Sequence, residues 1–153
     1  MLKPLEQWIC DVCGEVIEKP EDGYVVWNED RGDEYQYFGF TVIHQSRCDN
    51  DKLPNSLPVT DFLGELGLAV LISKLSAGPV INRNREHSSA GRVKDVDGFV
   101  DFFRRMQVPY YEEARRYFND PEFLEDYYDS NEVYTYQPKV LKQIVERFGE
   151  NGP

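Results

Sequence analysis

The sequence of 153 residues contains no long apolar run and only three cysteines. Its longest unbroken stretch of aliphatic residues and glycine covers residues 66–72, whereas a membrane-spanning helix needs about 20 apolar residues. No membrane helix is therefore expected. The N-terminal residues lack the apolar core of a secretory signal, so we expect a cytoplasmic protein. An odd number of cysteines cannot pair completely in disulfides, which favours another use for the thiols.

Basic side chains are also scarce, because 17 Lys and Arg residues face 28 Asp and Glu residues, for a net charge of −11. The excess acid lies at both ends: residues 1–60 carry twelve acidic and five basic side chains, and residues 109–153 carry ten and five. DNA-binding proteins usually present a clustered basic face, so attraction of the whole chain to nucleic acid is disfavoured. With 41% apolar and 14% aromatic residues, the chain is too apolar to be disordered.

The cysteines and one of the two histidines form a metal-ligand pattern. Cys10 and Cys13 are separated by two residues and followed by Gly14, and His44 and Cys48 follow thirty residues later. Two thiolates at this spacing reach one ion from a tight turn, and glycine permits the positive φ that such a turn needs. His44 and Cys48 could share one side of a helical turn or meet where a strand ends in a loose turn.

A β-hairpin is expected between the two ligand pairs. Residues 23–28 and 35–44 are rich in β-forming side chains, and the polar residues 29–34 between them are typical of a turn. The hairpin would return the chain to its start and bring the four ligands together. Over residues 6–50 the chain then resembles a zinc ribbon, in which a second pair, here His-x-x-x-Cys, completes the site. The resemblance implies a structural zinc ion held by Cys10, Cys13, His44 and Cys48.

The sequence also permits two other uses of the thiols, namely simple burial in the core and a redox dithiol. Catalytic chemistry at the metal is not indicated, because four ligands leave no open position for water. The position two residues after His44 is Ser46, whereas a zinc deaminase has glutamate there. The sequence also lacks His-Glu-x-x-His, and Ser88 and Ser89 are not in a Gly-x-Ser-x-Gly elbow.

Helices are expected after residue 59, in a domain of residues 60–153 joined to the zinc-ribbon-like module, residues 1–50, by a connector of residues 51–59. The first helix, from a cap at Thr60 or Asp61 to residue 75, is apolar nearly all round and predicts a core helix. Further helices are expected at residues 95–107, capped by Asp95, from Pro109, at 120–128, capped by Asp120, and at 138–149. The fold class is therefore α+β, with an N-terminal zinc-ribbon-like β-hairpin packed on a C-terminal bundle of four or five helices.

Two segments are candidates for contact with a partner protein. The polar residues 82–94 could grip a phosphate or an acidic surface, and residues 110–136 hold seven of the ten tyrosines with eight acids. The alternatives are a solvated loop in the first case and tyrosine rings packed in the core in the second. The candidate residues are Arg83, Arg85, Arg92 and Lys94 in the first segment and Tyr110, Tyr111, Tyr127 and Tyr128 in the second.

The leading hypothesis is a non-catalytic, zinc-stabilised protein-interaction module. The alternative is a nucleic-acid-associated regulator that uses the basic residues of the loop 82–94, because zinc ribbons often serve nucleic-acid machinery. The third choice is a hydrolase using His87 and nearby carboxylates. No interaction with a membrane is expected.

Overall fold

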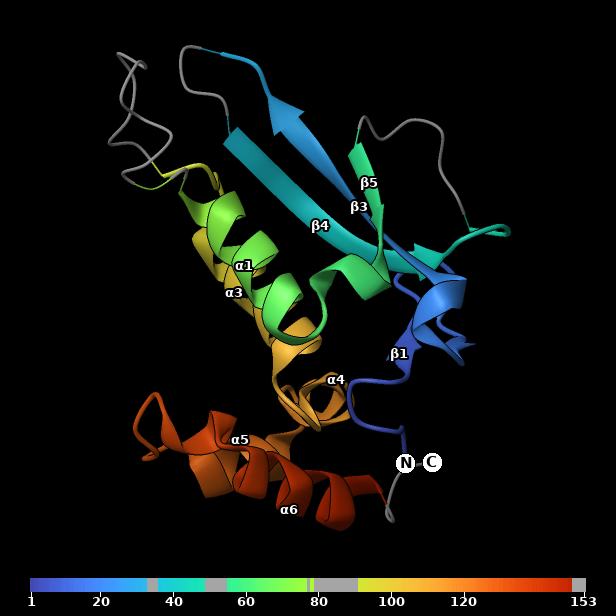
Figure 1. The fold of residues 1–153 in the computed structure, drawn as a ribbon. Helices are drawn as coiled ribbons and strands as arrows, with labels where there is room; N and C mark the ends of the chain where they lie inside the picture. The colour runs from blue at the N-terminus through green and yellow to red at the C-terminus, as the bar shows by residue number, and fades with distance from the viewer. Residues whose placement is uncertain (33–35, 49–54, 77, 79–90, 150–153) are drawn as a thin grey trace.

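The fold is α+β, as expected, with antiparallel strands in the N-terminal part and helices after them (Figure 1). The computed structural model describes residues 1–32, 36–48, 55–76, 78 and 91–149.

A three-stranded antiparallel sheet forms the centre of the N-terminal part. Strands β3 (Gly23–Asp30) and β4 (Gln36–His44) make the expected hairpin, with a register shift between Val26 and Asn28. Strand β5 (Asn55–Pro58) pairs with the other edge of β3, giving the order β4-β3-β5. The segment expected to be a connector therefore contains a strand, because the free edge of β3 offers backbone hydrogen bonds that Asn55–Pro58 satisfies.

A second, very small sheet comes before the hairpin. Strands β1 (Trp8–Ile9) and β2 (Val16–Ile17) pair antiparallel, with Trp8 opposite Ile17 and Ile9 opposite Val16. A short 3₁₀ turn, η1 (Pro20–Asp22), then leads into β3. The two-strand ribbon holds the ends of the Cys10–Glu15 turn together.

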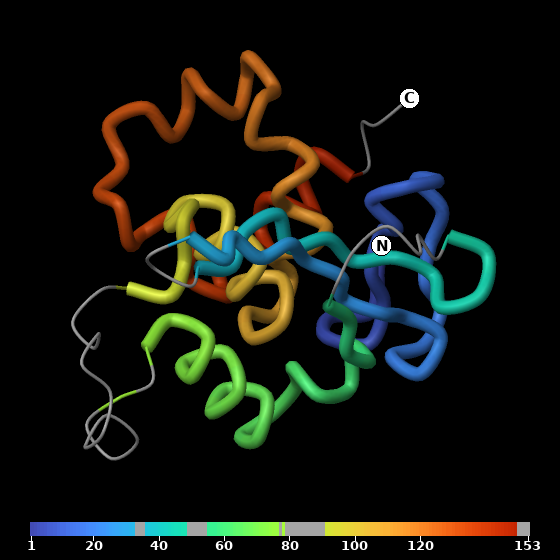
Figure 2. The backbone as a smooth tube through the Cα atoms, turned by 90° about the horizontal axis from the view of Figure 1, so that it is seen from above, coloured from blue at the N-terminus to red at the C-terminus, as the bar shows by residue number. Residues whose placement is uncertain are grey.

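Two helices pack with the three-stranded sheet. Helix α1 (Gly64–Leu75) and helix α3 (Val96–Gln107) lie side by side, and α3 also contacts β4 (Figures 1 and 2). Asp95 caps α3 as expected, because its side chain accepts a hydrogen bond from the backbone N–H of Gly98. The first core has an aromatic centre in which the rings meet in both stacked and edge-to-face pairs, formed by Trp27, Phe40, Phe62, Phe99 and Phe102.

The expectation of a core helix at residues 60–75 is wrong in two respects. Residues 59–62 form a 3₁₀ turn, η2 (Val59–Phe62), and α1 begins only at Gly64, with Leu63 rather than Thr60 or Asp61 at its N-cap. The helix is also not buried on all sides, since Leu66 is 74% exposed and Ile72 is 53% exposed. Sheet and α3 cover only one side of α1, so its apolar circumference exceeds the surface available to cover it.

The C-terminal helices form a second core. After α4 (Tyr111–Ala114) and the 3₁₀ turn η4 (Arg115–Tyr117), the chain continues through α5 (Pro121–Tyr127) and the 3₁₀ turn η5 (Tyr134–Tyr136) to α6 (Pro138–Gly149). Asp120 caps α5 as expected, because its side chain accepts hydrogen bonds from the backbone N–H groups of Glu122 and Phe123. The buried side chains of this core are Tyr111, Ala114, Phe123, Val140, Leu141, Ile144, Val145 and Phe148.

The two cores are formed by different parts of the chain. The first combines the strands with α1 and α3, and the second contains only elements after Gln107. The assignment of residues 1–50, 51–59 and 60–153 to separate folding units stays a prediction. Within the described ranges, no helix has the length and apolar content needed to cross a membrane.

Candidate metal centre

The first ligand pair lies in a tight turn between β1 and β2. The backbone N–H of Cys10 donates to the carbonyl of Glu15, and the N–H of Gly14 donates to the carbonyl of Cys10, each over 2.9 Å. Gly14 has φ of +74°, in the left-handed region that glycine adopts without steric cost. The turn expected from Cys-x-x-Cys-Gly is therefore present.

The second pair lies at the end of the hairpin. His44 is the last residue of β4 and pairs with Gly23, the first residue of β3. Cys48 follows after a three-residue turn, so a strand that ends in a loose turn, rather than a helix, presents this pair. The hairpin thus returns the chain to its start, as the sequence predicts.

The four side chains converge on one point. Their candidate ligand atoms, three sulfurs and one imidazole nitrogen, all lie within 4.8 Å of one another. His44 Nδ1 is 3.5 Å from Cys13 Sγ and 3.8 Å from Cys48 Sγ. A tetrahedral zinc ion, with bonds of about 2.3 Å to sulfur and about 2.0 Å to nitrogen, separates sulfur from nitrogen by about 3.5 Å. The cluster could therefore hold a metal ion with little rearrangement.

The second nitrogen of His44 has a partner that suits a metal ligand. His44 Nε2 lies 3.2 Å from the carbonyl oxygen of Val16 in β2, to which a protonated Nε2 donates. A histidine that binds a metal through one nitrogen usually donates its other N–H in this way, which fixes the ring orientation. Arg47 Nη2 lies 3.0 Å from the same nitrogen and can donate to it only when Nε2 carries no proton, and Arg47 also forms an ion pair with Glu15. The imidazole is thus turned so that Nδ1 faces the thiols.

The thiols differ in burial and in acidity. Cys10 and Cys48 are buried and Cys13 is exposed. Burial raises the pKa of Cys10, but hydrogen bonds to its sulfur from the backbone of Cys13, Val12 and His44 outweigh it, and the pKa falls to about 6. Burial and hydrogen bonds with Cys13 and Cys10 raise the pKa of Cys48 to about 11. One thiol is therefore ready to act as a thiolate, while its neighbour retains a proton.

Asp11, within the first ligand turn, joins the turn to the rest of the molecule. Its backbone N–H donates to the carbonyl of Val42 over 2.8 Å, and its carboxylate accepts from the N–H of Val42 over 2.6 Å. Val42 lies in β4, two residues before His44. The same carboxylate oxygen accepts a hydrogen bond from Arg105 Nη1 of α3 over 2.7 Å.

Arg105 is 3% exposed and has its charge balanced inside the protein. Glu112 of α4 accepts two of its hydrogen bonds, at 2.6 and 2.9 Å, and the carbonyl of Ile9 accepts a third at 3.1 Å. Burial lowers the pKa of Arg105, but the attraction of Glu112 and Asp11 outweighs this and raises it. The ligand turn, α3 and α4 are therefore joined by one buried ionic network.

The sequence did not reveal this network. By sequence alone, Arg105 lies in the last turn of its helix, where a cation complements the helix dipole, and Glu112 lies four residues before Arg116, the spacing of an ion pair on a helix. Helix α4 ends at Ala114, so the spacing that would place Glu112 beside Arg116 does not apply. The spacing in α3 did carry one indication of a buried arginine: Arg105 follows Phe99 and Phe102 at intervals of three residues, and all three side chains are buried in the structure.

Only two of the four candidate basic residues lie within the described ranges of the chain. Arg83 and Arg85 lie outside the described residues, as does His87. Arg92 donates to the carbonyl of Ser73 and lies over the Tyr37 ring, and Lys94 forms an ion pair with Asp30 at 2.8 Å. Arg92 and Lys94 thus already have partners within the chain.

The four candidate tyrosines have different environments. Tyr111 is 3% exposed and its hydroxyl donates to Asp101, so it packs in the second core, as the alternative for this segment predicts, and it offers no contact surface. Tyr110 is partly buried at the N-cap of α4, with a left-handed φ of 68°. Tyr127 is partly buried, whereas Tyr128 is 86% exposed. The exposed aromatic surface is therefore near the end of α5.

Comparison of the sequence and the structure with known proteins identified no relative. No protein-family model, curated protein or solved structure matches the chain.

Proposed function

We propose that the protein is a non-catalytic, zinc-stabilised interaction protein, in which Cys10, Cys13, His44 and Cys48 hold one structural zinc ion. The convergence of three thiols and one imidazole, at separations suited to a tetrahedral ion, supports this proposal. Thiolate and imidazole ligands favour zinc among the common divalent ions. The resemblance of residues 6–50 to a zinc ribbon points the same way.

The zinc ion would act on the fold rather than on a substrate. Four protein ligands fill a tetrahedral shell, and a filled shell leaves no position at which water could be activated. The ion would join the turn of Cys10 and Cys13 to the end of β4. Because Asp11 in the same turn balances Arg105, the ion would also fix the position of α3 and α4 relative to the sheet.

Metal analysis of the purified full-length chain tests the zinc site. We expect one zinc ion per chain by elemental analysis, and tetrahedral cobalt–thiolate absorption when cobalt replaces zinc. His44→Ala should reduce the zinc content well below one ion, while His87→Ala, which removes the only other histidine, serves as the matched control. Zinc content below one ion in the wild type, or unchanged content in His44→Ala, would contradict the proposal.

Chemical crosslinking in cells followed by mass spectrometry tests the interaction function. We expect the full-length chain to capture a protein at residues of the Tyr-rich segment 110–136. Replacing Glu125 and Asp129 by lysine should reduce capture, whereas replacing Glu18 and Glu21, which are equally acidic and exposed near β2, should not. Capture of nucleic acid instead, lost when Arg92 and Lys94 are replaced by alanine, would favour the regulator hypothesis and overturn this one.

A further inference from the structure

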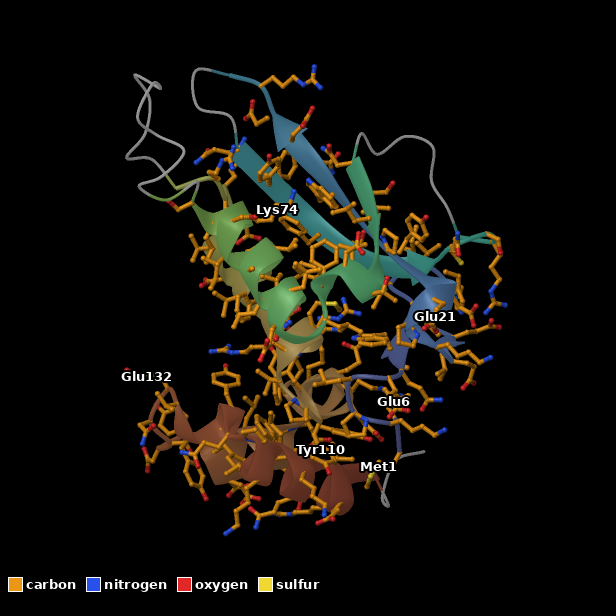
Figure 3. The ribbon with its side chains drawn as sticks, in the orientation of Figure 1. Met1, Glu6, Glu21, Lys74, Tyr110 and Glu132 are labelled. Carbon is orange, nitrogen blue, oxygen red and sulfur yellow. The ribbon has the colours of Figure 1, made fainter. Side chains whose placement is uncertain are left out.

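An aromatic cleft opens between α5 and the segment that follows it. It has a volume of about 400 Å³. Its lining combines aromatic and aliphatic side chains with one carboxylate, Glu132. The apolar lining is Phe118, Phe123, Leu124, Tyr127, Tyr128 and Tyr136. Figure 3 places Glu132 at the outer end of the segment that joins α5 to α6.

Exposed apolar side chains are concentrated in the segment of the chain that lines this cleft. Ten large apolar side chains are exposed among the described residues, and four of them lie in the span 124–134. They are Leu124, Tyr128, Val133 and Tyr134. Exposed apolar side chains gathered round a hollow are typical of a binding surface.

The segment that lines the cleft also has the most one-sided charge of the C-terminal part of the sequence. Residues 117–138 contain six acidic side chains and no Lys or Arg. Arg147 of α6 pairs with Glu122 and Asp126, at 2.7 and 2.5 Å. Within the described part of the chain, Glu125, Asp129 and Glu132 form no ion pair. Their negative charge is available to a cationic ligand.

The chain's own arginines show which cation suits these walls. The guanidinium carbon of Arg104 lies 3.5 Å from the centroid of the Tyr136 ring, which is one wall of the cleft. Arg147 lies over the Phe148 ring while pairing with carboxylates of α5. A planar guanidinium can stack on an aromatic face and donate to a carboxylate at the same time, which a lysine ammonium cannot do in the same geometry.

We propose that this cleft binds an arginine side chain from a basic segment of the partner protein. The guanidinium stacks between the tyrosine rings of the cleft, and Glu132 accepts its hydrogen bonds at the rim. The inference rests on the interaction function proposed above and names the chemistry of the partner. It does not depend on the metal, since no residue of the Cys-His cluster lines the cleft.

A peptide with three arginines separated by glycines is the probe for this site. Added to the full-length protein, it should shift the amide NMR resonances of residues 118–136. The same peptide with citrulline in place of arginine is isosteric and uncharged, and it should bind at least tenfold more weakly. A lysine peptide of equal charge should bind more weakly than the arginine peptide, because it lacks the stacked guanidinium.

Two protein variants locate the binding. Tyr128→Ala should raise the dissociation constant of the arginine peptide about two- to fivefold, the usual size of an exposed cation–π contact. Leu66→Ala, which truncates an exposed apolar side chain on α1, is the matched control and should leave it unchanged. Glu132→Gln should weaken binding more than Glu65→Gln, which removes the same charge from α1.

Each contrary outcome has a definite meaning. Equal binding of the citrulline peptide, or shifts confined to residues outside 118–136, overturns the arginine site. Equal weakening by Glu132→Gln and Glu65→Gln overturns it in favour of unspecific attraction to the acidic chain. A dimer that Tyr128→Ala converts to a monomer, without peptide binding, overturns it in favour of contact between two copies.

The experiments distinguish failure of the arginine site from failure of the proposed interaction function. A cellular partner that wild type and Tyr128→Ala capture equally overturns the arginine site and leaves the interaction function intact. Failure to capture any partner counts against the interaction function itself, even if the cleft binds the peptide.

Discussion

The two cores of this protein are stabilised in different ways. The first is a sheet with two helices, and at its N-terminal end the chain is held by polar groups: a cluster of side chains that could hold a metal ion and a buried arginine with two carboxylates. The second core consists of aromatic and aliphatic side chains between short helices. Its aromatic surface continues outward into an open cleft.

This difference separates maintenance of the fold from recognition. Polar centres such as the Cys-His cluster and Arg105 need every partner in place, because a buried charge or thiolate without a partner is costly. Aromatic packing tolerates loss at its outer edge, where rings are already exposed to water. We therefore expect substitutions at the polar centres to unfold the protein, and substitutions at the rim of the cleft to change binding alone.

The largest effect should come from loss of the proposed zinc ion. Cys48→Ser, or removal of the ion by a strong chelator, should lower the free energy of unfolding by more than about 5 kcal/mol, since binding energy at a structural zinc site is folding energy. Hydrogen exchange should accelerate in β1, β2 and the β3–β4 hairpin and remain slow in α6. Ser46→Ala, between the ligands, is the control. Equal acceleration in both cores would show that they do not respond separately.

Arg105→Ala should give the next largest effect, about 3–5 kcal/mol, because it leaves two buried or partly buried carboxylates without their counter-charge. Chemical denaturation measures the change. Arg104→Ala, one residue earlier, removes an arginine that stacks on the Tyr136 ring and should cost about 1 kcal/mol or less. Similar losses in the two variants would contradict the central place given to the Arg105 network.

Gly14→Ala should have an intermediate effect, about 1–2 kcal/mol, because an L-residue is strained at its φ of +74°. No atom would clash with the added methyl group, so the loss measures backbone conformation alone. Gly91→Ala, also with open space around it and without a positive φ, is the matched control. We expect thermal unfolding to separate the two, with the Gly14 variant also binding zinc more weakly.

Tyr128→Ala should have the smallest effect on stability, within about 0.5 kcal/mol, because the side chain is 86% exposed. Phe123→Ala, also in the lining of the cleft but only 5% exposed, should cost about 3–5 kcal/mol. Thermal unfolding of both variants tests whether the rim of the cleft can be altered without loss of the core beneath it. A large loss in Tyr128→Ala would remove the distinction between rim and core.

Local signals in the sequence predicted local structure well. Asp95 and Asp120 cap the helices expected to follow them, and the hairpin runs between the strands that its β-forming residues indicate. The Cys-x-x-Cys-Gly turn and the approach of His44 and Cys48 to it were also correctly predicted. Each of these features depends on residues close in sequence or on a single hairpin closure.

Features that depend on which surfaces of the folded chain pack together could not be predicted from local sequence patterns. The uniform apolar character of α1 could not show that only one side of it is covered, and residues 55–58 carried no sign of the strand edge they would join. The partners of Arg105 lie 94 and 7 residues away, so only the tertiary fold could identify them. The same holds for the cleft, which exists because α5 and η5 leave their rings unpacked on one side.

The uncovered side of α1 also bears on how the protein behaves at high concentration. The exposed side chains of Leu66, Leu68 and Ile72 form an apolar patch on the surface of α1. At neutral pH, the charge of −11 makes copies of the chain repel one another and keeps such patches apart. As the pH approaches the isoelectric point near 4.6, that repulsion vanishes, and kosmotropic salt screens it while strengthening contacts between apolar surfaces. Ammonium sulfate at neutral pH should therefore precipitate the folded protein before it unfolds, and Leu66→Ser should shift the salt concentration at which this happens.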